Sequence, residues 1–138
     1  MPQLLQPGDA LARVALEDQN GIPRLVDSST RIVVFTRDMS GGEIVKQAFA
    51  GLRSAALEAN HVACVCDVSG MPWLVRSMFA LPGLRKRLYP VMLDESGEAT
   101  RAFPYREGKA SILVLDSGII ASVAYAGTGD EVTAALRL

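Results

Sequence analysis

The sequence is poor in the residue types on which metal sites and disulfide frameworks depend. Its 138 residues include two cysteines, one histidine and one tryptophan. Two thiols and one imidazole exclude a disulfide framework and fall short of the about four nitrogen or sulfur ligands of a zinc site. A formal net charge of −1 without a basic tail excludes the electrostatic footprint of nucleic-acid-binding proteins. We therefore expect no metal, no cofactor and no nucleic-acid partner.

Long hydrophobic runs are also absent. The longest apolar stretch, Ala110–Gly127, is interrupted by Asp116 and by glycines, whereas a membrane-spanning helix needs roughly 20 apolar residues. The first residues show neither the basic segment nor the apolar core of a secretory signal. We expect no membrane span, and a cytoplasmic location for the chain as given, or a periplasmic one if a native signal peptide was removed.

Hydrophobic residues nevertheless make up 49% of the chain, enough for a real core. The continuous apolar runs Arg31–Thr36 and His61–Asp67 are typical of strands buried on both faces. Between them, the helical spacing of apolar residues from Gly42 to Asn60 predicts an amphipathic helix. We expect one domain over residues 1–138.

Turn residues and periodicity predict the remaining elements. Leu11–Leu16 and Arg24–Val26 should form a hairpin at a sheet edge, and Ala110–Asp116 should pair with Gly118–Tyr125. We expect further helices over residues 71–79, 97–103 and 128–136, and a strand over residues 89–94. The order predicts an α/β fold with a central mixed sheet, helices on both faces and an N-terminal β-hairpin.

Several short motifs resemble those of thioredoxin-like proteins. Pro7–Leu11 followed by Val14–Asp18 resembles the start of redoxin and peroxiredoxin chains. Trp73–Ser77, Leu88–Pro90 and Ser111–Asp116 are similar to the YtfJ-like group of bacterial thioredoxin-fold proteins. The resemblance implies a thioredoxin-like fold, in which the loop after the first central strand carries a Cys-x-x-Cys motif and begins a helix.

That loop carries no cysteine in this sequence. By the resemblance, Ser40 stands at the nucleophile and Glu43 at the resolving cysteine, while Ala110 replaces the family's cis-proline ahead of Ser111. Exchange needs a thiolate at a helix start and a second thiol that resolves the mixed disulfide. We therefore expect a degenerate active-site loop without dithiol oxidoreductase activity.

Two interpretations of this loop remain open. In the first, Ser40 and Glu43 form a capping box in which each side chain accepts a hydrogen bond from the other's backbone amide. In the second, the amides of Gly41 and Gly42, with Arg37 adjacent, bind a small anion or a partner's carboxylate. The candidate binding residues of the loop region are Arg37, Asp38, Ser40, Gly41, Gly42, Glu43, Ala110 and Ser111.

Three further groups of residues invite a functional interpretation. Cys64 and Cys66 lie about 6.6 Å apart at their Cα atoms if the strand is extended, which is long for a disulfide. Their apolar surroundings favour structural burial, with Cys66 as the alternative reactive thiol. Arg76 interrupts an apolar helix face and matches an arginine of the YtfJ-like group. The run Arg85–Arg87 is typical of a solvated helix end.

From the sequence we predict a non-catalytic thioredoxin-fold binding or interaction module. Its partner would be a protein, a small anion or a second copy in a homodimer. Two alternatives stay open: a redoxin-type thiol enzyme that uses Cys66 alone, and an anion-binding regulator at the Ser40–Glu43 helix start.

Overall fold

The computed structural model describes residues 4–50, 54–71 and 81–136. Its strands are β1 (Val14–Glu17), β2 (Pro23–Val26), β3 (Ile32–Thr36), β4 (Val62–Asp67), β5 (Met92–Asp94), β6 (Ala110–Asp116) and β7 (Ile119–Ala126). Its helices are α1 (Met39–Ala48), α2 (Ser54–Ala59), α4 (Leu81–Arg85) and α5 (Gly129–Leu136). None of the helices in these ranges is long and apolar enough to cross a membrane.

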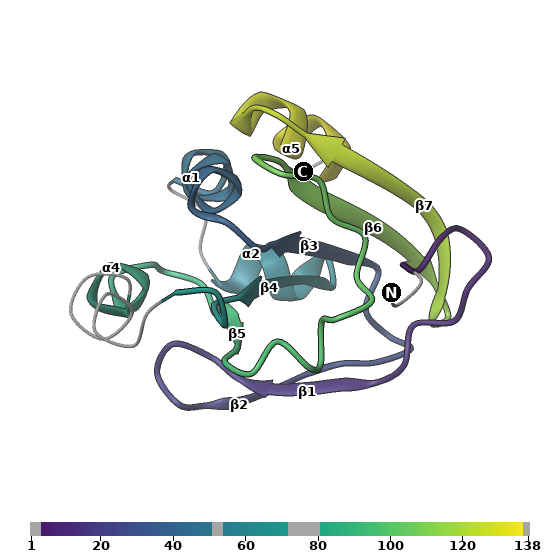
Figure 1. The fold of residues 1–138 in the computed structure, drawn as a ribbon, viewed down its shortest axis with the longest axis horizontal. Helices are drawn as coiled ribbons and strands as arrows, with labels where there is room; N and C mark the ends of the chain where they lie inside the picture. Colours follow the sequence, from purple (N-terminus) through teal and green to yellow (C-terminus); the bar gives the residue numbers. More distant parts are fainter. Residues whose placement is uncertain (1–3, 51–53, 72–80, 137–138) are drawn as a thin grey trace.

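A five-stranded mixed sheet of order β5-β4-β3-β6-β7 forms the centre of the fold (Figure 1). β3, β4 and β5 run parallel, whereas β6 is antiparallel to both β3 and β7. Val33 and Phe35 of β3 belong to one core cluster, and Val34 between them belongs to the other. This alternation confirms that the apolar run is a central strand buried on both faces.

The described helices all contribute to the same core cluster. Val45 of α1, Leu57 of α2, Leu84 of α4 and Val132 of α5 are buried together with Val34. Figure 1 shows α1 and α5 on one side of the sheet and the β1–β2 hairpin on the other. The sequence predicts helices on both faces of the sheet. Within the described ranges, the helices cover one face.

The opposite face is covered by the hairpin and by the segment before β6. Val14 and Val26 pack there with Phe103, whose ring meets that of Phe35 edge to face at 5.0 Å. The predicted N-terminal hairpin is confirmed, but β1 and β2 form a two-stranded sheet of their own rather than extending the central sheet. An isolated bridge between Asp18 and Met92 links this small sheet to β5.

The predicted helix over residues 97–103 is also wrong, since this segment forms turns. The carboxylate of Asp94 accepts hydrogen bonds from the amides of Gly97 (3.1 Å) and Thr100 (2.8 Å). Gly97 adopts a φ of +80°, which lies in the left-handed region. A helix would need right-handed backbone here, and Asp94 supplies acceptors that replace the helical carbonyls.

The predicted helix from Gly42 to Asn60 corresponds to two helices, α1 and α2. α1 ends at Ala48, and Phe49 leaves helical geometry with φ −99° and ψ 7°. Its ring is buried edge to face on that of Tyr89, at 5.1 Å. Periodicity could not show this break, because Phe49 is apolar and in phase with the helix face.

Two other elements of the C-terminal half agree with the predictions made from the sequence. The β6–β7 hairpin and α5 are confirmed, and the Thr128 hydroxyl accepts a hydrogen bond from the Glu131 amide at the start of α5 (3.2 Å). The helix expected over residues 71–79 lies outside the described residues except for Met71, and Arg76 lies outside them as well.

Candidate functional site

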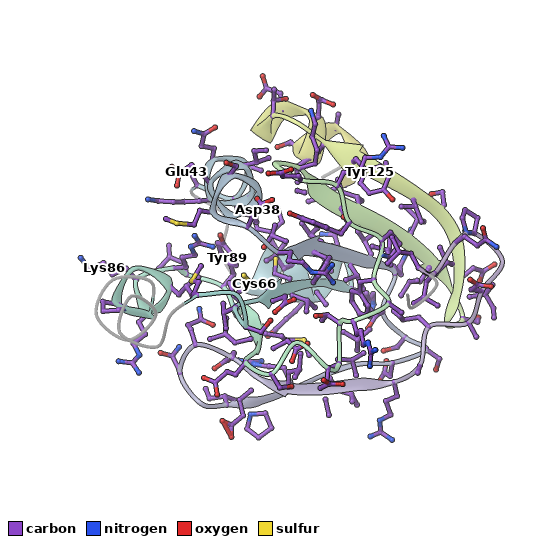
Figure 2. All side chains as sticks on the ribbon, viewed as in Figure 1. Asp38, Glu43, Cys66, Lys86, Tyr89 and Tyr125 are labelled. Carbon is purple, nitrogen blue, oxygen red and sulfur yellow. The ribbon has the colours of Figure 1, made fainter. Side chains whose placement is uncertain are left out.

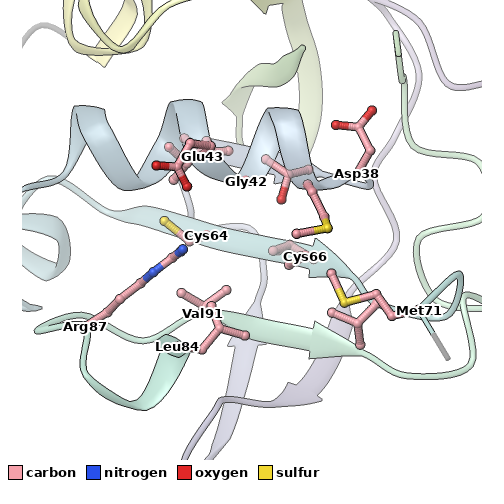
Figure 3. Close-up of a pocket in the computed structure, with 15 residues that line it drawn as sticks. Asp38, Gly42, Glu43, Cys64, Cys66, Met71, Leu84, Arg87 and Val91 are labelled. Carbon is pink, nitrogen blue, oxygen red and sulfur yellow. The ribbon is translucent and has the colours of Figure 1, made fainter. Parts of the chain in front are cut away.

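A cavity of about 150 Å³ lies beside the carboxyl ends of β3 and β4. In Figure 3, α1 passes over it with Gly42 and Glu43, and β4 contributes Cys64 and Cys66 below. Open α/β sheets bind ligands at this edge, outside the carboxyl ends of their parallel strands. Its lining comprises Val34, Thr36, Asp38, Met39, Gly42, Glu43, Val45, Cys64, Val65, Cys66, Val68, Met71, Leu84, Arg87 and Val91.

Asp38 caps the start of α1 at the rim of this cavity. Its carboxylate accepts hydrogen bonds from the Gly41 amide, the Tyr105 hydroxyl and the Gly108 amide, each at 2.7 Å. Burial raises the pKa of Asp38, but these three hydrogen bonds outweigh it and hold the pKa below its usual value. The same bond to Asp38, assisted by burial, raises the pKa of Tyr105 to about 12.

The predicted Ser40–Glu43 capping box is therefore wrong. α1 begins at Met39, and its cap is Asp38, so Ser40 and Glu43 lie within the helix. The helix starts with the carboxylate of Asp38, and Gly41 follows three residues on. A negative charge already occupies the positive end of the helix dipole, which argues against binding of an anion at these amides.

Arg37 links β4 to the turns that precede β6. Its Nε donates to Asp67 at 3.1 Å, and its Nη2 donates to the Thr100 carbonyl at 2.9 Å. Its guanidinium also lies 4.8 Å from the centre of the Tyr105 ring. The structure thus places Arg37 outside the described lining of the cavity, against the ring of Tyr105, whose hydroxyl donates to Asp38.

The two glycines of the loop have different environments. A Cβ atom built on Gly41 would lie 2.6 Å from the carbonyl oxygen of Lys109, closer than real Cβ atoms approach backbone. A Cβ on Gly42 would meet no atom within 4 Å. Gly41 is therefore required where α1 passes the start of β6, whereas Gly42 borders open space.

This difference predicts opposite effects of alanine at neighbouring positions. Gly41→Ala should lower the free energy of unfolding by about 1–3 kcal/mol, because the added methyl group overlaps the Lys109 carbonyl. Gly42→Ala should leave it unchanged or raise it by up to about 1 kcal/mol, because alanine favours the helix. Urea denaturation of both variants measures the difference, and equal effects would contradict the close approach at Gly41.

Ala110 and Ser111 have structural roles at the start of β6. Ala110 is fully buried and pairs with Ala126 of β7. The Ser111 hydroxyl donates to the Pro104 carbonyl at 2.6 Å and so holds the segment that precedes β6. Neither residue belongs to the described lining of the cavity.

Both thiols face the cavity from the same side of β4. Cys64 is buried and Cys66 half-buried, which confirms the burial predicted for Cys64. Burial raises the pKa of both thiols, although the nearby charge of Arg87 acts against the increase for each. A hydrogen bond with Thr36 also acts against it at Cys66. Among the described residues, no three His, Cys, Asp or Glu side chains are placed to hold a metal ion.

Arg87 belongs to the site, although its sequence context indicated a solvated helix end. Arg85 and Lys86 are exposed as predicted, and Lys86 lies at the outer side of α4 in Figure 2. Arg87 instead lines the cavity and extends toward Cys64, as Figure 3 shows. Its Nε atom is buried and makes no hydrogen bond with the described part of the chain.

Tyr89 carries a second buried polar atom without a partner in the described ranges, its hydroxyl oxygen. Burial raises the pKa of Tyr89 to about 12, and the charge of Arg87 opposes the increase. The pKa of Tyr89 also responds to Cys64, so the three side chains lie close together. In the sequence these residues are separated from Cys64 by a long stretch, and no motif connects them.

Comparison with known proteins identifies the fold. No protein-family model and no curated protein sequence matches the chain. Among solved structures, peroxidoxin BcpB from Mycobacterium tuberculosis superposes with a TM-score of 0.60 and 22% identity over 96% of this chain and 97% of that chain. A peroxiredoxin-like protein from Aquifex aeolicus gives 0.62 and 12% identity, covering 99% and 88%. A thiol peroxidase from Chromobacterium violaceum gives 0.56 and 11% identity, covering 99% and 89%. The chain therefore has a thioredoxin-like fold.

Proposed function

We propose that this chain is a thioredoxin-fold binding protein, one domain over residues 1–138, which holds a small ligand in the cavity and does not catalyse dithiol exchange. The observation that carries the proposal is the start of α1. Asp38 occupies the cap with three hydrogen bonds to its carboxylate, and Gly41 follows three residues on. Dithiol exchange needs a thiolate and a resolving thiol at this place.

The two thiols elsewhere do not replace that pair. Cys64 and Cys66 are spaced by one residue on a strand, and burial raises the pKa of both. The thiolate is the nucleophile, so both groups are mainly in the unreactive protonated form at neutral pH. A largely apolar cavity with a few charged groups at its edges is instead typical of a ligand-binding site.

The catalytic half of the proposal predicts inactivity in two assays. Reduction of insulin disulfides by dithiothreitol and consumption of hydrogen peroxide by dithiothreitol should proceed at the rate without protein. Cys64→Ser and Cys66→Ser variants serve as matched controls, and we expect no difference between them and the wild-type chain. A rate above background that disappears in Cys66→Ser would overturn this half of the proposal.

The binding half is tested with a small neutral probe, pentanamide. We expect its addition to shift the amide resonances of Val34, Cys64 and Val91 in two-dimensional NMR spectra. Gly42→Leu should abolish these shifts, because the open space beside Gly42 then holds the new side chain. Shifts elsewhere on the molecule, or shifts that persist in Gly42→Leu, would contradict a binding site in this cavity.

A second candidate is a redoxin-type enzyme that uses Cys66 alone. The half-exposed thiol lies in the cavity, and both Thr36 and Arg87 favour its ionised form. Maleimide labelling at pH 7 separates the candidates. Labelling that is much slower in the native protein than in urea supports the binding protein, whereas rapid native labelling of Cys66 with a pKa below its usual value supports the enzyme.

A further inference from the structure

We infer that the ligand of the cavity is a small aliphatic carboxylate, held at its charged end by Arg87 and enclosed at its hydrocarbon end by the apolar lining. The inference rests on the proposed function and names the chemical class of the ligand. It is carried by an unsatisfied buried donor of Arg87 in the cavity lining, by the lack of an acidic partner for this cation among the described residues, and by the volume and character of the lining.

The first observation is the state of Arg87. Its Nε is buried without a hydrogen-bond acceptor in the described chain. Ion pairs in these ranges join Arg24 to Asp18 and Glu58, Arg37 to Asp67, and Arg101 to Glu98, and none includes Arg87. Buried donors are nearly always satisfied, so a donor left open beside a cavity points to an acceptor supplied from outside the chain. A carboxylate suits a guanidinium because both are planar and can share two hydrogen bonds.

The second observation is the hydroxyl of Tyr89. It is buried near Arg87 and Cys64 and makes no hydrogen bond of good geometry with the described chain, although the Arg87 side chain is near enough to lower the pKa of Tyr89 as a hydrogen-bond partner. The ring of Tyr89 is fixed by its contact with Phe49, at 5.1 Å between centroids. Tyr89 is not among the described residues that line the cavity, so its hydroxyl acts on a ligand through the position of the Arg87 side chain.

The body of the ligand follows from the lining and the volume. Val34, Val45, Leu84 and Val91 surround the space together with the Met71 side chain. An apolar cavity of about 150 Å³ is large enough for a molecule the size of benzene, about six non-hydrogen atoms. This favours a short aliphatic acid over a peptide.

Acidic groups on the α1 side set the polarity of the site. Asp38 already accepts three hydrogen bonds, so it has little capacity for a ligand cation. Glu43 is exposed, and Figure 3 shows it across the cavity from Arg87, with Cys64 between them. Glu43 therefore repels a bound carboxylate and competes for Arg87 without reaching it in the structure.

The experiment compares pentanoate with pentanamide, which has the same shape and no charge, in NMR titrations of the full chain at pH 7. We expect pentanoate to bind at least about tenfold more tightly, because its hydrogen bonds to Arg87 are charge-assisted. Arg87→Met should reduce this preference to within about twofold. Lys86→Met is the matched control, since it removes a neighbouring exposed cation and should keep the full preference.

Two further variants test the polar end while leaving Arg87 in place. Tyr89→Phe keeps the ring contact and should weaken pentanoate binding about two- to fivefold, with little change for pentanamide. Glu43→Gln should strengthen pentanoate binding about twofold, because a competing negative charge is removed. Weaker pentanoate binding in Glu43→Gln would overturn the inference, since it would indicate a ligand whose cation meets Glu43. Tighter binding of a tetrapeptide with a C-terminal leucine than of pentanoate would overturn it in favour of a peptide terminus.

The outcomes separate this inference from the proposed function. Equal binding of pentanoate and pentanamide in the cavity would refute the carboxylate and leave a binding protein. Absence of binding by both compounds at 20 mM, on the order of the weakest affinity useful for molecules of this size, would refute both statements. Dithiol turnover would refute the absence of catalysis alone. The Arg87→Met result counts only if this variant has the melting temperature of the wild-type chain. If it does not, the preference of the wild-type chain for pentanoate over pentanamide decides whether the inference stands.

Discussion

Replacing Asp38 with alanine is expected to lower the free energy of unfolding by about 3 kcal/mol at pH 7. The substitution removes the acceptor of three short hydrogen bonds and leaves the amides of Gly41 and Gly108 without their partner. Urea denaturation measures the change. Tyr105→Phe is the matched control, because it removes one of the three bonds (2.7 Å) and should cost about 1 kcal/mol.

The effect should also depend on pH with a definite sign. The pKa of Asp38 in the folded state is lowered from its ordinary value of 3.8, so its carboxylate stabilises the folded state fully above that value. The stabilisation is lost as the pH falls through the folded pKa. The difference between wild type and Asp38→Ala should thus be largest above about pH 5 and narrow below the unfolded pKa. A difference that stays constant from pH 7 to pH 3 would show that the ionised carboxylate is not responsible.

Replacing Gln19 with leucine is expected to have an effect of similar size, about 2–4 kcal/mol. Gln19 is buried, and its amide nitrogen donates to the carbonyls of Leu84 (3.2 Å) and Tyr89 (2.8 Å). Its amide oxygen accepts from the Val91 amide at 2.7 Å. Leucine has similar volume but leaves three backbone groups unpaired, and each unpaired buried group costs about 1–3 kcal/mol before relaxation.

The exposed neighbour Asn20 provides the control for Gln19. Asn20→Ala should change the free energy of unfolding by less than about 0.5 kcal/mol, as is usual for surface substitutions. Thermal unfolding followed by circular dichroism compares the two variants at equal pH. Because Gln19 holds the segment on which Arg87 lies, Gln19→Leu should also reduce the preference for pentanoate over pentanamide. Equal stability of the two variants would mean that the hydrogen bonds of Gln19 are replaced by water.

The central strands could be predicted because burial on both faces leaves a direct trace in the sequence. β3 and β4 are uninterrupted apolar runs, and the structure places them side by side in the middle of the sheet. The β6–β7 hairpin could also be predicted from the sequence, because Ser117 and Gly118 separate two strands of similar length. In each case the information lies within a few residues of the element that it specifies.

The start of α1 could not be predicted in this way, because two residues compete for the cap. Asp38 and Ser40 are both good caps, and the local rule of a glutamate three residues on favours Ser40. The choice is made by distant groups: the Tyr105 hydroxyl and the Gly108 amide, 67 and 70 positions away, both donate to Asp38. A local pattern cannot contain these donors.

Arg87 was missed for the same physical reason. Three consecutive basic residues look equivalent in a sequence, and only the path of the backbone decides which of them turns inward. Gln19 fixes that path through bonds to residues 65 to 72 positions away. The sequence indicates which apolar residues are buried, but only the packed structure shows that they line a cavity together with Arg87.

The close approach at Gly41 has a consequence for protein engineering. A dithiol motif placed at this helix start would need cysteines at positions 38 and 41. The second cysteine would bring its Cβ to 2.6 Å from the Lys109 carbonyl oxygen, so the first residues of β6 would have to move. Cysteines at positions 38 and 41 alone would therefore strain the backbone at the start of β6. Redesign would have to begin with the backbone that precedes β6.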